Sequence, residues 1–417
     1  MQTFIKNSLK KHPYWNEIES IILKLSEKDF EVVIVGGAVR NALLNKAITD
    51  IDLATSAKPE QIVKIFPKSN SNFKKYGTVF IALKNKHTLE ITTFRKESNY
   101  KDGRRPKSVK YSSLKEDAQR RDFTINALFY NLKTDQVIDL FNGFKDLKNK
   151  KIKTVGKAEK RFKEDHLRML RALRLAQQLN FRLDKEIIKA FLKLNKNIKK
   201  ISKERILKEL MLMFSAGKID TILKELNNYG FFQYIFPELK IEKKYFNFWE
   251  KKFSFFSHPD LFWVFIGLPF FHSNRKSFSD FLTNYPIKKS IIKQSLSYLK
   301  SIQTLIDLNK SFTDKLMALN REKSLIYELT FQFLQSDILK NKNSKKIIQN
   351  LKFILKEFEK REINNKLPEP LLKGADLLKL CPSLKKQNFS KILKKAFICQ
   401  IENPKLNKKD ILKKLHV

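Results

Sequence analysis

Residues 32–40 read VVIVGGAVR, and this stretch decides how the first part of the chain folds. Four consecutive β-branched residues predict a short buried strand, and the glycine pair that follows permits a tight turn into a helix. Such a turn lets the backbone approach a phosphate, although glycine pairs often serve only as turns. The further glycines of a dinucleotide fingerprint and the Gly-Lys-Ser/Thr ending of a P-loop are missing. We therefore expect an α/β unit with a candidate phosphate-binding turn at Gly36 and Gly37.

A pair of acidic residues follows this turn. Residues 50–53 read DIDL, and alternate residues of a strand point to the same side, so Asp50 and Asp52 would share one face. Adjacent carboxylates repel each other unless a cation lies between them, and Mg²⁺ favours one or two carboxylates with substrate phosphates. A solvated pair on an edge strand is the alternative. Glu90, within the apolar run 88–94, would complete a metal cluster if its strand neighbours that of Asp52.

Two basic stretches come next. Residues 96–111 read KESNYKDGRRPKSVKY, which predicts either a mobile basic loop that closes on a triphosphate or an ordinary exposed connection. Residues 120–128 read RRDFTINAL. The arginines of such a run can grip phosphates, and its Asp or Asn can hydrogen-bond a sugar hydroxyl. A capping arrangement at a helix start is the alternative.

A possible base-reading pair lies further along the chain. Residues 164–171 read EDHLRMLR and are expected to open a helix. Asp165 and Arg168 stand three positions apart and so would lie on one face, where a plain helix salt bridge is the ordinary interpretation. The functional interpretation is that an acceptor beside a donor matches the edges of C and A, which present an amino group beside a ring nitrogen. The edges of U and G do not match.

In order and spacing these motifs resemble the class II tRNA nucleotidyltransferase and poly(A) polymerase family. The motifs that carry the resemblance are Gly36-Gly37-x-x-Arg40, Asp50-x-Asp52, Arg120-Arg121-Asp122 and Glu164-Asp165-x-x-Arg168. It continues through residues 139–146, 201–210 and 374–377. Residues 230–365 match in helical character rather than in motif.

The resemblance implies an α+β fold, in which a polymerase-β-like α/β nucleotidyltransferase head precedes all-α neck, body and tail domains. The expected boundaries are 1–140 for the catalytic head, 141–212 for the neck, 213–330 for the body and 331–417 for a basic, tRNA-binding tail. The residue pattern agrees with this division, since strand-like runs precede residue 140 and helical periodicity dominates after it. The expected strands are 31–35, 78–83, 88–94, 128–131 and 136–140, and the clearest expected helices are 164–178, 186–194, 203–214 and 219–226.

The resemblance also implies a reaction, in which an RNA 3′-hydroxyl attacks the α-phosphate of CTP or ATP and pyrophosphate is released. Asp50 and Asp52 would hold two Mg²⁺ ions, and Glu90 would be a third catalytic carboxylate. The implied nucleotide-binding residues are Gly36, Gly37, Arg40, Arg121, Asp122, Asn126, Asp165, Arg168, Arg171 and Arg174. The implied flexible-loop residues are Asp102, Gly103, Arg104 and Arg105.

The sequence departs from the family pattern at two places. Asn41 stands where the family usually has Asp after the arginine of its glycine motif, which leaves a nucleotide contact weakened or made by the neutral amide. Residues 383–389 replace a glycine-rich stretch that often follows the C-terminal Gly-x-Asp-Leu motif. The first departure leaves the metal pair intact, and the second concerns the local fold of the tail.

The composition points to a polyanionic partner. The chain of 417 residues carries a formal net charge of +42, and its excess of Lys and Arg is densest after residue 150. Nucleic acid is favoured over a membrane surface, although coding bias toward lysine contributes. The resemblance implies that this nucleic acid is tRNA, bound at its 3′ acceptor end and elbow. The longest apolar run, residues 261–271, is too short to span a bilayer. No secretory signal is visible and only two cysteines occur, so we expect a cytoplasmic protein.

Among the activities of the family, complete CCA addition is favoured. Residues 76–81 lack the basic stretch typical of bacterial poly(A) polymerases, and the loop sequence at 102–106, which CC-only enzymes tend to lack, is present. Poly(A) synthesis and partial addition of A or CC are the alternatives. A non-catalytic RNA-binding protein on the same scaffold is disfavoured because both Asp50 and Asp52 are retained.

Overall fold

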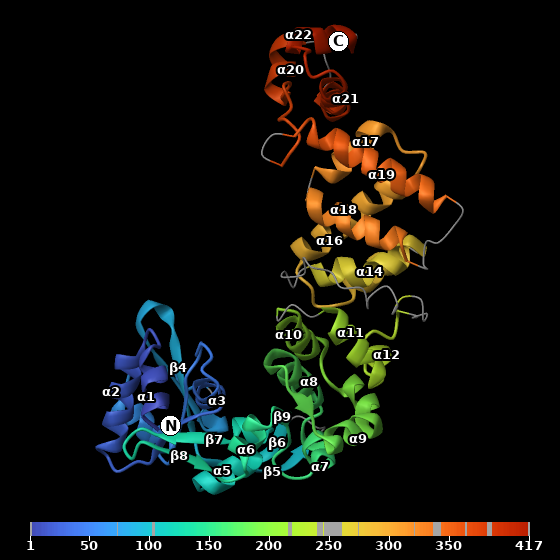
Figure 1. Ribbon diagram of the computed structural model, residues 1–417. Helices are drawn as coiled ribbons and strands as arrows, with labels where there is room; N and C mark the ends of the chain where they lie inside the picture. The colour runs from blue at the N-terminus through green and yellow to red at the C-terminus, as the bar shows by residue number, and fades with distance from the viewer. Residues whose placement is uncertain are drawn as a thin grey trace. The chain divides into compact units, whose positions relative to one another are not determined.

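The computed structural model describes residues 2–72, 74–101, 105–215, 219–239, 245, 261–273, 275–320, 322–336, 343–362, 365–381 and 386–415. The chain forms two compact units. Unit 1 comprises Met1–Lys218 with Glu225–Pro237, and unit 2 comprises Ile219–Lys224 with Glu238–Val417. An N-terminal α/β part is followed by helices (Figure 1), which confirms the expected fold class.

Unit 1 contains a six-stranded sheet with the strand order β3-β4-β2-β1-β7-β8. Strands β2 and β4 are parallel, and all other neighbours are antiparallel. The strands are β1 (Val32–Val35), β2 (Asp52–Thr55), β3 (Thr78–Ala82), β4 (Thr88–Thr93), β7 (Leu128–Asn131) and β8 (Gln136–Asp139). All five strand-like runs expected from the sequence form strands of this sheet.

Strand β1 is apolar throughout because both faces of the sheet are covered. Val32 and Ile34 belong to the larger core, whereas Val33 and Val35 belong to the smaller core on the other face. The larger core includes residues of α1 (Gln2–Lys10), α2 (Trp15–Ser26), α3 (Gly37–Leu43) and α4 (Pro59–Ile65). The smaller core includes residues of α5 (Leu114–Arg120).

The basic stretch at 96–111 is mostly a β-hairpin, so the expectation of an irregular loop was wrong there. Strands β5 (Arg95–Lys101) and β6 (Arg105–Tyr111) pair antiparallel and form a separate two-stranded sheet. Both strands of such a ribbon are edge strands, which tolerate a proline such as Pro106. Of the four expected loop residues, Arg105 begins β6, and Asp102, Gly103 and Arg104 lie outside the described residues.

Helices dominate unit 1 after β8, as the sequence predicts. They are α6 (Gly143–Lys148), α7 (Ala158–Glu164), α8 (Leu167–Leu179), α9 (Lys185–Leu194), α10 (Lys203–Phe214), α11 (Ile219–Asn228), which continues from unit 2, and α12 (Phe232–Ile235). Two short strands, β9 (Lys151–Ile152) and β10 (Arg182–Leu183), pair with each other. The 3₁₀ turns are η1 (Lys74–Tyr76), η2 (Lys84–Lys86), η3 (Thr124–Asn126), η4 (Asn195–Lys200) and, in unit 2, η6 (Lys386–Asn388).

The motif at 164–171 does not open one helix, which corrects the sequence expectation. Glu164 ends α7, and Asp165 follows with extended backbone angles of φ −141° and ψ 108°. The Asp165 carboxylate then accepts the backbone N–H of Leu167, the first residue of α8, at 3.0 Å. The extended backbone of Asp165 thus separates α7 from α8, and its side chain binds the first residue of α8.

The sheet joins the helices at a constrained corner. Asp139 accepts the backbone N–H groups of Phe141, Gly143 and Phe144 at 3.2, 2.8 and 2.9 Å. A Cβ atom at Gly143 would collide with the carbonyl oxygen of Thr124, so this close approach requires glycine. The Thr124 hydroxyl also donates to Asp146 at 2.7 Å. These contacts fix η3, which contains Asn126, against α6.

The regular elements described in unit 2 are helices and one 3₁₀ turn. Its helices are α14 (Phe262–Ser273), α15 (Arg275–Thr283), α16 (Lys289–Ile306), α17 (Phe312–Leu319), α18 (Lys323–Leu334), α19 (Ser344–Glu359), α20 (Gly374–Leu380), α21 (Phe389–Glu402) and α22 (Lys408–Lys414). The apolar run at 261–271 forms the buried helix α14, as expected. Within the described part of the chain, no helix has both the length and the apolar character needed to cross a membrane.

Candidate active site

The sheet brings the glycine turn and two acids to the same end of three adjacent strands. Val35, the last residue of β1, pairs with Asp52 at the start of antiparallel β2. Asp52 in turn pairs with Glu90 of parallel β4. Gly36 leaves β1 with φ +70° and ψ −127°, a conformation that side chains disfavour. The turn at residues 36–37 therefore lies beside the paired acids Asp52 and Glu90.

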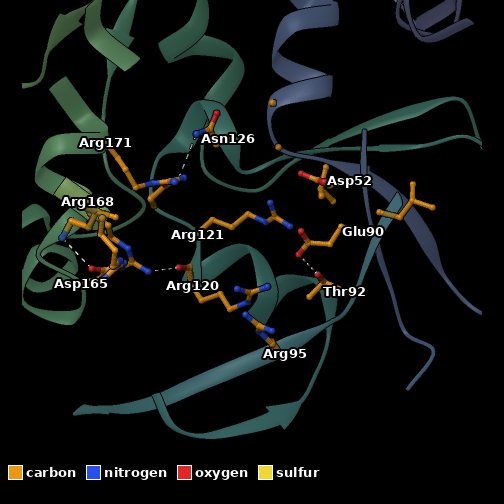
Figure 2. Close-up of a pocket in the computed structure, with 17 residues that line it drawn as sticks. Asp52, Glu90, Thr92, Arg95, Arg120, Arg121, Asn126, Asp165, Arg168 and Arg171 are labelled. Carbon is orange, nitrogen blue, oxygen red and sulfur yellow. Dashed lines mark hydrogen bonds and ion pairs between the residues drawn. The ribbon is translucent and has the colours of Figure 1, made fainter. Parts of the chain in front are cut away.

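A cavity of about 500 Å³ opens in front of this sheet edge (Figure 2). The expected site residues that line it are Gly36, Gly37, Asp52, Glu90, Arg121, Asp122, Asn126, Asp165, Arg168 and Arg171. Four further polar residues line it as well, namely Thr92, Arg95, Arg120 and Arg205. The cavity is large enough for a nucleotide-sized ligand. Asp50, Arg40 and Arg174 are not among its lining residues.

The acids of the cavity repel one another. Asp52 is open to the cavity, yet its pKa is raised to about 6. The largest cause is partial desolvation of its carboxylate by the surrounding protein, and the charges of Glu90 and Asp50 add to it. Asp50 is exposed and its carboxylate accepts the Thr49 hydroxyl at 3.0 Å. In the described residues, no three His, Cys, Asp or Glu side chains are grouped closely enough to hold a metal ion. A pair of carboxylates with uncompensated charge nevertheless fits Mg²⁺, whose other ligands are usually water and substrate phosphates.

The buried carboxylate of Asp117 binds two arginines of the cavity, Arg120 and Arg121. The Asp117 side chain is fully buried and forms ion pairs with Arg120 at 2.7 Å and Arg121 at 3.1 Å. Although burial alone would raise the pKa of Asp117, these arginines lower it. The Arg121 guanidinium also lies 4.8 Å from the centroid of the Phe129 ring. Sequence reasoning missed Asp117, although its spacing of three and four residues from the arginines on α5 is a usable signal.

Asp122 is an anchor between the head and α8. Its Oδ2 accepts Arg171 Nε at 2.8 Å, and its Oδ1 accepts the backbone N–H of Phe123 at 2.8 Å. Burial would raise the pKa of Asp122, but Arg171 and Arg168 outweigh it and lower the pKa to about 2. Arg120 and Arg121 close helix α5 before this residue, so the interpretation of 120–128 as a helix start was wrong.

Asp165 and Arg168 both line the cavity but are held by different partners. Arg205 donates to Asp165 Oδ2 at 3.0 Å. Arg168 donates to Glu164 at 2.9 Å and to the carbonyl oxygen of Arg120 at 3.0 Å. The plain Asp165–Arg168 salt bridge is thus replaced by two separate ion pairs. Arg205, on α10, is a residue of the cavity to which the sequence assigned no role.

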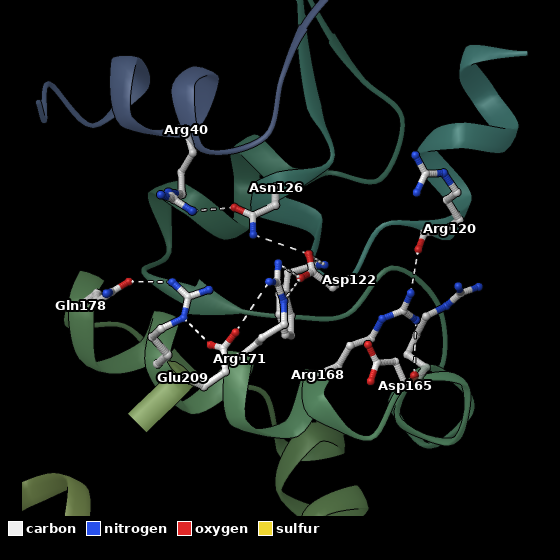
Figure 3. A network of polar contacts seen from close by, with 12 residues as sticks. Arg40, Arg120, Asp122, Asn126, Asp165, Arg168, Arg171, Gln178 and Glu209 are labelled. Carbon is white, nitrogen blue, oxygen red and sulfur yellow. Dashed lines mark hydrogen bonds and ion pairs between the residues drawn. The ribbon is translucent and has the colours of Figure 1, made fainter. Parts of the chain in front are cut away.

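Arg174 is not among the residues that line the cavity. Its Nε donates to Glu209 Oε2 at 2.6 Å, and another nitrogen donates to Gln178 at 3.0 Å (Figure 3). Glu209 is buried and lies on α10. Arg174 therefore links α8 to α10.

Comparisons with known proteins find similarity in two parts of the chain. The family model described as "Poly A polymerase head domain" matches residues 32–153, and the model described as "Probable RNA and SrmB- binding site of polymerase A" matches residues 180–242. A CCA-adding enzyme of Enterococcus faecalis is 46% identical over 200 residues, which cover 48% of this chain and 49% of that protein. One of Pediococcus pentosaceus is 43% identical over 222 residues, which cover 52% and 55%. The chain thus spans about half the length of the curated relatives it matches.

Solved structures are similar over nearly the whole chain. The Bacillus stearothermophilus CCA-adding enzyme in complex with CTP is 25% identical with a TM-score of 0.73, and the match covers 97% of this chain and 98% of that one. The Thermotoga maritima CCA-adding enzyme complexed with tRNA has the same fold, with 18% identity, a TM-score of 0.65 and coverage of 99% and 97%. The fold and site define a nucleotidyltransferase-type head with helical domains after it. The matched head and RNA-binding regions, together with the fold, make the chain similar to the class II tRNA nucleotidyltransferase and poly(A) polymerase family.

Proposed function

We propose that this chain is a CCA tRNA nucleotidyltransferase that adds C, C and A to the 3′ end of tRNA from CTP and ATP without a nucleic acid template. The observation that carries the proposal is the composition of one cavity. It has paired acids at one wall, arginines beside them, and Asp165 with Arg168 from the helices. The relatives named CCA-adding enzymes support the choice of reaction.

Asp52 and Glu90, with Asp50 nearby, are the residues that would hold Mg²⁺. Bound Mg²⁺ neutralises phosphate charge and activates an attacking oxygen. Burial, followed by the charges of Glu90 and Asp50, raises the pKa of Asp52, and a cation shared by these carboxylates would relieve the repulsion among them. The acids therefore mark the end of the cavity at which the α-phosphate and the RNA 3′-hydroxyl meet.

The phosphates of the nucleotide are assigned to the turn at Gly36 and to Arg121. The nearest contact that a Cβ at Gly36 would make is to Arg121 NH1, at 3.7 Å, so the turn and the guanidinium face the same space. The ion pair with Asp117 already fixes the Arg121 side chain. Little side-chain entropy of Arg121 is therefore lost when the nucleotide binds. Arg120 and Arg95 line the same region of the cavity and add positive charge.

The base is assigned to Asp165 and Arg168. Each side chain is fixed by an ion pair to Arg205 or Glu164, so the acceptor and donor are presented in a set geometry. A carboxylate oxygen retains lone pairs for a base amino group after accepting one protein hydrogen bond. C and A offer that amino group beside a ring nitrogen, which explains a preference for CTP and ATP.

The RNA partner is assigned to the lysine-rich end of unit 2. Helices α21 and α22 and the segment between them expose Lys391, Lys394, Lys395, Lys405, Lys408, Lys409, Lys413 and Lys414. Such a surface binds a folded RNA through its phosphates and its shape. Cys381 and Cys399 are free, in keeping with our assignment of the reaction to the cytoplasm.

The proposal is tested by offering the protein a tRNA that lacks its last three nucleotides, with Mg²⁺ and CTP labelled at the α-phosphate. We expect label to enter the RNA and one pyrophosphate to be released for each nucleotide incorporated. A chelator should stop both, and excess Mg²⁺ should restore both. Binding of the tRNA without incorporation would instead support a non-catalytic RNA-binding protein.

A further inference from the structure

Tyr111 is an exposed aromatic residue at the root of the basic hairpin. It is the last residue of β6 and is 41% exposed. It pairs directly with Arg95, the first residue of β5, and Arg95 lines the cavity. The side chains of directly opposed residues in an antiparallel pair stand on the same face of the ribbon. Tyr111 therefore lies beside a cavity-lining arginine.

The turn at Gly77 supports both of these side chains. A Cβ atom at Gly77 would lie 3.6 Å from Arg95 Cδ and 3.6 Å from Tyr111 Cε1. Gly77 has φ +74°, a left-handed conformation that favours glycine. Its carbonyl oxygen accepts the backbone N–H of Thr93 at 2.8 Å. The tyrosine ring and the arginine thus rest against a turn that is fixed to the end of β4.

Backbone contacts hold the root of the hairpin in place. The N–H of Ser112, which follows Tyr111, donates to the carbonyl oxygen of Phe94 at 2.9 Å. On the other strand, the backbone N–H of Arg95 donates to the buried Asp117 of α5 at 3.4 Å. A ring on a fixed backbone loses little freedom when a ligand stacks on it.

One wall of the cavity leads from the acids to this ring. Glu90, Thr92 and Arg95 all line the cavity, and Figure 2 shows Glu90 and Thr92 across it from Asp165. The base of the nucleotide is assigned to the Asp165 side. The RNA 3′-hydroxyl must reach the α-phosphate at the acids, from the side opposite to the departing pyrophosphate. The wall that ends beside Tyr111 is the one that these assignments leave for the RNA.

An exposed aromatic ring beside an arginine suits the end of a single RNA strand. Unpaired bases stack on aromatic side chains, and basic side chains follow the neighbouring phosphates. Such stacking tolerates every base, because each base has a π-face. Tolerance is needed at this place, since the terminal base of the RNA changes as nucleotides are added.

We propose that Tyr111 stacks on the base of the RNA 3′-terminal nucleotide and thereby holds the 3′-hydroxyl near Asp52 and Glu90. The inference rests on the proposed function, in that the cavity extends an RNA 3′ end. It supplies a contact for the growing end of the RNA, in addition to the lysine-rich end of unit 2.

Two substitutions separate stacking from simple packing. Tyr111→Leu keeps an apolar side chain against Gly77 but removes the ring, whereas Tyr111→Phe keeps the ring. With tRNA lacking its last three nucleotides, we expect Tyr111→Leu to raise the KM for RNA about tenfold, as for a lost base–aromatic stack. The KM for CTP in Tyr111→Leu, and the KM for RNA in Tyr111→Phe, should stay within about twofold of the parent values. Phe4→Leu is the matched control, because Phe4 of α1 is 44% exposed and does not line this cavity.

Fluorescence reports the stacking without catalysis. The RNA carries 2-aminopurine, a base whose emission falls when it stacks, as its 3′-terminal nucleotide. Binding to the parent chain or to Tyr111→Phe, with saturating protein and no CTP, should lower the emission. Emission from the complex with Tyr111→Leu should be at least about twofold higher than from the parent complex, because the stacking partner is gone.

An unchanged KM for RNA in Tyr111→Leu, or equal emission from its complex and the parent complex, would overturn the inference and leave the proposed function standing. If circular dichroism shows that Tyr111→Leu does not fold, undiminished emission in the parent complex also overturns the inference. Failure of the parent chain to incorporate CTP would refute the proposed function, and the emission would still report whether Tyr111 stacks on the RNA.

Discussion

Asp52 on β2 is the direct neighbour of Glu90 on β4 in a parallel pairing, although 38 residues separate them in the sequence. The same residue pairs with Val35, which precedes the glycine turn. Asp52 thus lies next to both Glu90 and the end of the strand that leads into the proposed phosphate-binding turn. The proposed chemistry depends on this junction.

Removal of the Asp52 charge should abolish catalysis while RNA binding persists. Asp52→Asn keeps the shape of the side chain but removes a proposed ligand of Mg²⁺. We expect nucleotide incorporation to fall by more than about 100-fold, since even residues that only support metal ligands commonly cost 10- to 100-fold. Incorporation of labelled CTP measures catalysis, and a filter-binding assay measures the affinity for tRNA. An equal loss of tRNA binding would refute the metal assignment.

Replacement of Asp165 should relax nucleotide choice. Asp165→Ala removes the acceptor proposed for the amino group of C and A and frees Arg205 from its ion pair. The ratio of kcat/KM for CTP to that for UTP should fall by about tenfold or more, as for a lost hydrogen bond in a selective site. Glu159→Ala is a suitable control, because Glu159 is a carboxylate on α7 that does not line this cavity. An unchanged ratio in Asp165→Ala would contradict the base-reading role.

The ion pair of Asp122 should make the free energy of unfolding depend on pH in the acidic range. Its pKa of about 2 lies below the ordinary value of about 3.9, so its contribution is complete above about pH 4. That contribution, about 2–3 kcal/mol, is lost as the pH falls toward 2. Asp122→Asn should therefore lower the free energy of unfolding at pH 7, and the difference from the parent should shrink below pH 4. Denaturant titrations across this pH range measure it, and a constant difference would contradict the assignment.

Gly143 should not tolerate a side chain. Gly143→Ala places a Cβ against the Thr124 carbonyl oxygen, a backbone atom that cannot rotate away. We expect a loss of about 1–3 kcal/mol in the free energy of unfolding of unit 1, as for overpacking. Gly374→Ala is the matched control, since no atom would lie within 4 Å of its Cβ. Similar unfolding temperatures for both variants would show that the corner after β8 is not tightly packed.

Much of the fold follows from local sequence patterns, and the exceptions have physical causes. The run at 32–35 and the helix at 203–214 agree with β1 and α10 because apolar periodicity reports burial directly. The hairpin β5–β6 was missed because Pro106 and a basic composition are typical of loops, whereas a two-stranded ribbon tolerates both. The break at Asp165 was missed because extended backbone at this single residue ends α7 without altering the apolar pattern.

The candidate site was predictable as a set of residues but not as a set of partners. Asp52, Glu90, Arg121 and Asp165 line one cavity, as the motifs suggest. Which arginine meets which acid depends on packing between elements distant in sequence, such as Arg205 with Asp165. The hydrogen bond from Arg40 to Asn126 is of the same kind, since it depends on how α3 and η3 approach each other.

The order and the end point of addition test the central claim most directly. The protein is given tRNA lacking its last three nucleotides, Mg²⁺ and all four nucleoside triphosphates, and the product 3′ ends are sequenced. The account predicts that C, C and A are added in that order and that addition then stops. A long A tail would identify poly(A) synthesis, and addition of only CC or only A would identify a partial enzyme, so either result would contradict the account.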